Sequence, residues 1–202
     1  MTATDENLRQ ELLALRAEDE RVREELAQTG ELFEGYHPKM EAVHLKNAVR
    51  LEEMLAKYGW LGKSLVGEDG AEAAWLIIQH AISCPRLQKK ALPILREKIE
   101  KGEAPAWQAA YLEDRILIFE GKPQIYGTQF DWDKQGKMSP LPIFEPEKID
   151  ERRISVNLSV PYSEVLEKHR QFAETSNEKP PANFDERQRE FEEWAHKVGW
   201  RD

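Results

Sequence analysis

The chain has 202 residues, of which 33% are charged and 40% hydrophobic, and its formal net charge at pH 7 is -9. These values indicate one folded domain with appendages, and the negative charge argues against nucleic acid or an anionic membrane surface as the main partner. The single Cys84 excludes an internal disulfide and a cysteine-based zinc site. No apolar run reaches the roughly 20 residues of a membrane span, and no signal-peptide pattern opens the chain, so we expect a cytoplasmic protein.

The first predicted element is a long charged helix from Asp5 to about Thr29. Its apolar residues recur at nearly heptad spacing: Leu8, Leu12, Leu15, Val22 and Leu26. Asp19 interrupts this stripe. Two interpretations stay open, a surface helix packed along the domain and a coiled-coil arm that forms a homodimer. In both, residues 1–35 are an N-terminal amphipathic segment that flanks the main domain.

The most informative predicted helix covers Glu68 to Pro85, because it is apolar around its whole circumference, as a core helix is. We expect Asp69 to be its N-cap. Gln79 and His80 interrupt the apolar surface. An unpaired polar group in a dry core costs about 1–3 kcal/mol, so both side chains need partners.

Further helices are predicted on either side, at about 38–58, 85–101, 105–120, 146–158 and 161–173. Strand-like residues at 124–132, a turn, and a return at 138–144 predict a β-hairpin, with a bulge or a close approach to the backbone at Gly127. Residues 174–182 resemble a linker, and 183–202 form a last amphipathic helix. The fold class is therefore mainly α: a compact helical core at 36–173 with a short hairpin, flanked by two amphipathic helices.

The candidate chemistry centres on His80, which could act as a general base with Asp114 as its orienting carboxylate. Arginines could bind a carboxylate or phosphate, and amides and hydroxyls could orient a ligand. The proposed ligand-binding residues are Gln79, Tyr111, Arg115, Tyr126, Thr128, Gln129, Arg152 and Arg153. We expect no cofactor. We also expect no metal, because it would need His80 plus carboxylates while His37, His44, His169 and His196 lie in outer segments.

Several motifs between Trp60 and Arg153 together resemble an uncharacterised bacterial domain family. They are Ala74-Trp75-Leu76 followed by Gln79-His80-Ala81, Tyr111-Leu112 with Asp114-Arg115, Gly121-Lys122-Pro123-Gln124 running into Tyr126-Gly127-Thr128-Gln129, and Asp150-Glu151-Arg152-Arg153. Ile82-Ser83-Cys84 departs from that family's pattern, which has an Asp in this segment. The resemblance implies a shared site and names no reaction.

Two functions follow as hypotheses. The first is a domain that binds a small polar or peptidic ligand, or an enzyme with hydrolase-like acid–base chemistry, at a pocket formed by His80, Asp114 and Gln129. The second is a non-catalytic helical module that dimerises or docks on a partner through its terminal helices. A purely structural network, in which the same polar residues pin the hairpin to the helices, is the alternative for the site itself.

Overall fold

The computed structural model describes residues 4–33, 35–176 and 179–202. The helices are α1 (Glu6–Thr29), α2 (Pro38–Tyr58), α3 (Lys63–His80), α4 (Pro85–Glu100), α5 (Ala106–Phe119), α6 (Ile149–Ser155), α7 (Tyr162–Thr175) and α8 (Phe184–Val198), with short 3₁₀ turns η1 (Glu31–Phe33) and η2 (Pro146–Lys148). Two short strands, β1 (Phe130–Trp132) and β2 (Met138–Pro140), form an antiparallel hairpin. The prediction of a mainly α domain with a short β-hairpin is confirmed.

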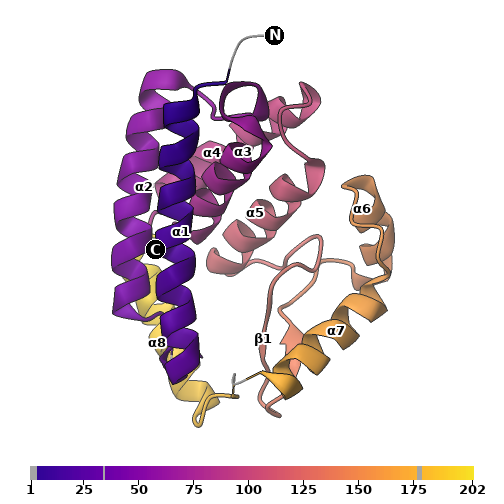
Figure 1. Ribbon diagram of the computed structural model, residues 1–202. Helices are drawn as coiled ribbons and strands as arrows, with labels where there is room; N and C mark the ends of the chain where they lie inside the picture. Colours follow the sequence, from indigo (N-terminus) through magenta and orange to yellow (C-terminus); the bar gives the residue numbers. More distant parts are fainter. Residues whose placement is uncertain (1–3, 34, 177–178) are drawn as a thin grey trace.

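Helix α1 is part of the main core. It runs beside α2 and packs along α3, as Figure 1 shows. Leu8 and Leu12 are buried in the same hydrophobic cluster as the residues of α3, and Val22 and Leu26 form a second cluster with Met40 of α2. The apolar stripe that suggested a coiled-coil dimer is therefore covered by helices of the same chain.

Helix α3 passes through the centre of this core, where Ala73, Ile77 and Ile78 are fully buried. The helix begins earlier than predicted, at Lys63, and it kinks at Gly67, whose φ is +74°. Asp69 is not its N-cap. Its carboxylate instead accepts a hydrogen bond from Arg9 Nε of α1 at 2.8 Å, which connects the first helix to the part of α3 just after the kink.

The hairpin is shorter than the sequence predicts. Residues 124–129 form no strand, because backbone N–H groups in this segment donate to the carboxylate of Asp114 on α5. Gly127 has a φ of +67°, and a Cβ atom there would lie 2.5 Å from the ring of Tyr162, so the expected close approach to this backbone is present. Helix α7 packs on β2 (Figure 1).

The C-terminal segment is also integrated into the fold. Asn183 caps α8 by accepting a hydrogen bond from the Glu186 N–H, as the sequence predicts. After the helix, the Trp200 indole donates to the carbonyl of Ile82 at 2.7 Å, and Arg201 Nε donates to the carbonyl of Phe119. Of the linker expected at 174–182, residues 174 and 175 belong to α7, and residues 177–178 lie outside the described residues.

Among the described residues, none of the helices combines the length and the apolar character that a membrane span requires.

We predict that Leu12→Ala lowers the free energy of unfolding by about 2–5 kcal/mol, because Leu12 is completely buried between α1 and the core. Val49→Ala is the matched control, since Val49 is 58% exposed, and it should change stability by less than about 0.5 kcal/mol. Urea unfolding measures both. A Leu12→Ala variant of unchanged stability but altered sedimentation mass would instead make α1 an intermolecular helix.

Candidate functional site

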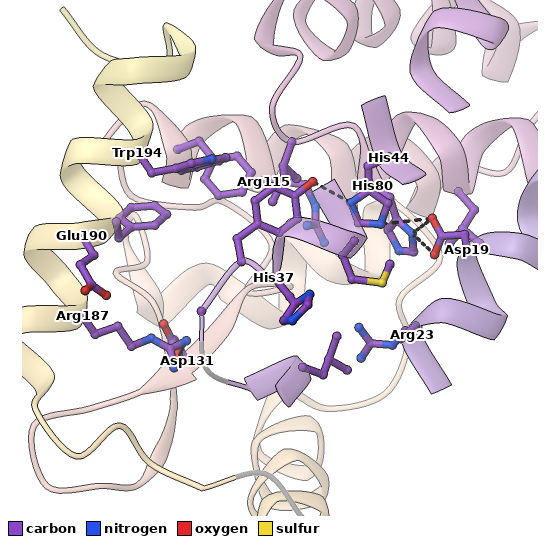
Figure 2. A pocket seen from close by; sticks show the side chains of 18 of the residues that line it. Asp19, Arg23, His37, His44, His80, Arg115, Asp131, Arg187, Glu190 and Trp194 are labelled. Carbon is purple, nitrogen blue, oxygen red and sulfur yellow. Dashed lines mark hydrogen bonds and ion pairs between the residues drawn. The ribbon is translucent and has the colours of Figure 1, made fainter. Parts of the chain in front are cut away.

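A cleft of about 990 Å³ lies between the helical core and α8. Each of five helices contributes a side chain to its wall: Asp19 from α1, His44 from α2, His80 from α3, Arg115 from α5 and Trp194 from α8 (Figure 2). Its volume is in the range of pockets that enclose a small molecule. The cleft therefore joins charged groups from distant parts of the sequence.

Asp19 and His80 form the central pair of the cleft. Nδ1 of His80 lies 2.9 and 3.0 Å from the two carboxylate oxygens of Asp19. Asp19 is buried, whereas the His80 side chain is 26% exposed. Among the described residues nothing is bonded to Nε2 of His80, and the ring lines the cleft, so this nitrogen is available to a ligand or to water.

His44 lies on the other side of the same carboxylate. Its Nδ1 is 2.8 Å from the Tyr36 hydroxyl, and its Nε2 is 3.2 Å from Oδ2 of Asp19. The second contact is close enough for an ion pair but is poorly aligned for a hydrogen bond, so Nε2 stays buried without a hydrogen-bond partner among the described residues. The centroids of the His44 and His80 rings are 5.1 Å apart.

The surroundings favour an ionised Asp19 and a neutral His80. Burial alone would raise the pKa of Asp19, but the close contacts with His80 and His44 outweigh it and hold that pKa well below its usual value. Burial lowers the pKa of His80 more than Asp19 raises it, and the charge of Arg115 lowers it further. A neutral His80 that donates Nδ1–H to Asp19 keeps a lone pair on Nε2.

Arg23 and Arg115 are two of the charged residues that line the cleft. Nε of Arg115 donates to Oε1 of the buried Gln79 at 2.6 Å. Neither Arg115 nor Arg23 of α1 has an ion-pair partner within the part of the chain that the structure describes. Burial lowers the pKa of Arg115 from 12.5 to about 10, and the nearby charge of Arg23 contributes.

Asp19, His44 and His80 could also hold a metal ion, because each offers a ligand atom and these atoms lie within 4.8 Å of one another. One carboxylate and two imidazoles form a donor set that zinc and other divalent transition metals accept. The expectation that His44 lies away from His80 was wrong, because α2 and α3 pack together through this region.

The predicted pairing of His80 with Asp114 is not present. Asp114 is completely buried. Its carboxylate accepts hydrogen bonds from the N–H groups of Ile125, Tyr126 and Thr128, at 2.7, 3.0 and 3.0 Å, and from the Thr128 hydroxyl at 2.9 Å. Burial raises the pKa of Asp114 and these hydrogen bonds oppose the shift. Asp114 therefore anchors the loop before β1, and Asp19 takes the place predicted for it beside His80.

Most of the other predicted ligand-binding residues lie around that loop or in the core. The backbone of Gln129 donates to the side chain of Gln124, and Arg153 donates to the carbonyl of Tyr126. The Arg152 guanidinium donates a hydrogen bond to the carbonyl of Glu145. Tyr111 packs edge-on against Trp75 and Trp107. Of the whole predicted set, His80 and Arg115 line the cleft. Gln79 lies outside the lining and accepts the hydrogen bond from Nε of Arg115.

Sequence reasoning missed Asp19, Arg23 and His44 as site residues. One signal was available: Asp19 is a charge in the middle of an otherwise apolar stripe, which can indicate a buried partner as well as a poor coiled-coil seam. Arg23 follows it by one helical turn and so lies on the same side of α1.

The chain matches the family described as "Family of unknown function (DUF6624)" over residues 6–182. The chain belongs to this family. The matched region contains Asp19, Arg23, His44, His80 and Arg115, whereas α8, which forms one wall of the cleft, follows the end of the match. The expected membership of an uncharacterised domain family is thus confirmed. No curated protein and no solved structure matched the chain.

We predict that Asp114→Asn lowers the free energy of unfolding by about 2–4 kcal/mol, because the amide NH₂ would face backbone donors that now bond a carboxylate. Asp133→Asn is the control: Asp133 accepts similar bonds in the exposed hairpin turn and should cost less than about 1 kcal/mol. Urea unfolding compares them. If the Asp114→Asn protein were as stable as wild type but had lost ligand binding, Asp114 would be a ligand-binding residue and not a structural one.

Proposed function

We propose that this protein is an enzyme that binds a small polar molecule in the cleft and converts it by acid–base chemistry, with His80 as the general base and Asp19 as its orienting carboxylate. The observation that carries the proposal is the geometry of His80. Its Nδ1 lies 2.9 and 3.0 Å from the buried Asp19 oxygens, while its Nε2 is left free at the cleft (Figure 2).

The proposed mechanism uses only side chains of this chain. Asp19 accepts the Nδ1–H hydrogen bond and so places the lone pair of His80 on Nε2. Nε2 takes a proton from the bound molecule or from a water molecule beside it, and the imidazolium that forms is stabilised by the carboxylate. When water is the proton donor, the hydroxide that forms attacks the ester, amide or phosphate centre of the bound molecule. His80 then returns the proton to the oxygen or nitrogen that leaves as its bond to that centre breaks. His44 lies against the same carboxylate, and its ring is held by Tyr36, which keeps Asp19 in place.

Electrostatics favour acid–base chemistry over a metal ion at the same three side chains. Arg115 lies close enough to lower the pKa of His80, and Arg23 adds a second positive charge at the cleft. Two guanidinium groups without carboxylate partners repel a divalent cation and attract an anion. We therefore assign the His–Asp pair to proton transfer.

The alternative function, a helical interaction module, has lost its main support. It depended on free apolar faces on the terminal helices. Leu12 of α1 and Ala195 of α8 are instead completely buried in one core. We accordingly propose neither the homodimer through α1 nor docking through α8, and a small polar or peptidic molecule remains the proposed partner.

The experiment incubates the protein with a defined panel of metabolites, including esters, amides, phosphates and carboxylates, and follows consumption by mass spectrometry. We predict that the wild-type protein converts at least one compound and that His80→Gln slows this conversion by about 10²–10⁴-fold, the usual contribution of a general base. Conversion should persist in EDTA, because no step uses a metal ion.

His196→Gln is the matched control, since His196 is exposed on α8 and lies outside the cleft. It should keep full activity, and urea unfolding should confirm that His80→Gln is folded. The proposal fails if the wild-type protein converts nothing in the panel, if His80→Gln is as active as wild type, or if EDTA abolishes the conversion.

A further inference from the structure

We infer that the molecule bound in the cleft carries an anionic oxygen group, a phosphate or a carboxylate, and that Arg23 and Arg115 bind this group. The inference names the substrate class of the proposed enzyme and in that respect rests on the proposed function. The binding itself does not depend on catalysis and can be measured separately.

Acidic residues outnumber basic ones in this chain, 38 to 29, so carboxylates are available to pair with its arginines. Several arginines have carboxylate partners: Arg9 pairs with Asp69, Arg50 with Glu11, and Arg187 with Asp131. Arg152 and Arg153 instead donate to backbone carbonyls, and they lie outside the cleft. Within the described residues, Arg23 and Arg115 have no such partner, although both line the same cleft. A negatively charged group of a bound ligand could form ion pairs with both guanidinium groups.

The position of Arg115 is fixed before any ligand arrives. Its Nε bonds the amide oxygen of Gln79, which is buried, and this single contact orients the planar guanidinium. The two terminal nitrogens have no hydrogen-bond partner among the described residues. A guanidinium held in this way presents two N–H groups in the geometry that matches the two oxygens of a carboxylate or phosphate.

The second cation, Arg23, belongs to α1 and lies on the same face of this helix as Asp19. Arg23 lies one turn after Asp19 on α1, and its charge acts directly on Arg115. Two like charges brought together at a partly buried surface repel each other, and an anion between them removes this repulsion. Figure 2 shows Arg23 on the same side of the cleft as Asp19 and His80.

The anion site adjoins the proposed base. Gln79, which orients Arg115, is the residue before His80, and the charge of Arg115 lowers the pKa of His80. A bound oxygen group would therefore place the neighbouring bonds of the ligand near Nε2 of His80. The opposite wall, on α8, offers Trp194 and the carboxylate of Glu190 (Figure 2), and Phe191 of the same helix also lines the cleft. The ligand then extends from its anionic group toward an aromatic wall.

Isothermal titration calorimetry with inorganic phosphate and with acetate, at constant ionic strength set by chloride, tests this assignment. We expect one anion to bind wild-type protein with saturation, and Arg23→Gln and Arg115→Gln each to raise its Kd by about tenfold or more, since each removes charge-assisted hydrogen bonds. Arg187→Gln is the matched control. Arg187 lines the same cleft but is paired with Asp131, so its loss should leave Kd within about threefold.

His80→Gln separates this inference from the proposed function, because it should abolish conversion and still bind the anion. Tighter binding of phosphate assigns a phosphoryl group and tighter binding of acetate assigns a carboxylate, and both support the site. The site is refuted if neither anion binds above chloride, or if Arg23→Gln binds as wild type does. Arg23 is exposed, so that variant folds even if Arg115→Gln, which frees the buried Gln79, does not.

Discussion

The buried carboxylate of Asp19 is the constraint around which this cleft is organised. A charge that is taken out of water must be compensated, or the fold loses several kcal/mol. Here the compensation comes from His80 at the end of α3 and from His44 in the second turn of α2, so that one acidic residue on α1 contacts two other helices. The same contacts give His80 its tautomer. Stability and the proposed chemistry therefore depend on the same contact, between Nδ1 of His80 and the carboxylate of Asp19.

A second buried carboxylate, that of Asp114, also connects separate segments of the chain, but with different partners. It accepts hydrogen bonds from backbone N–H groups and a hydroxyl, and it fixes the loop that precedes the hairpin. The polar residues discussed above thus form two groups, one around Asp19 and one around Asp114. The groups that donate to Asp114 lie outside the lining of the cleft, whereas His80, beside Asp19, and Arg115 line the cleft and keep nitrogens free for a ligand. This difference is why we place function at Asp19.

The helices could be predicted from the sequence because their apolar periodicity and caps are local properties; α2 and the Asn183 cap of α8 agree with the prediction. The hairpin was overestimated because composition at 124–129 is strand-like while Asp114, on another helix, captures the backbone donors. Of the site, His80 and Arg115 were identified. Their partners could not be, since which acid meets His80 is decided by how α1 packs on α3, and periodicity does not contain that information.

The central claim is that His80 is neutral, with its proton on Nδ1 and a free Nε2. Long-range ¹H–¹⁵N NMR of the histidine rings, with His80 assigned from the His80→Gln spectrum, reads both properties during a pH titration. We predict an Nδ1–H tautomer at pH 7 and protonation of His80 only below the ordinary pKa of 6.5, because burial and the positive charge of Arg115 oppose a second proton. An Nε2–H tautomer, or an imidazolium at pH 7, would contradict the account.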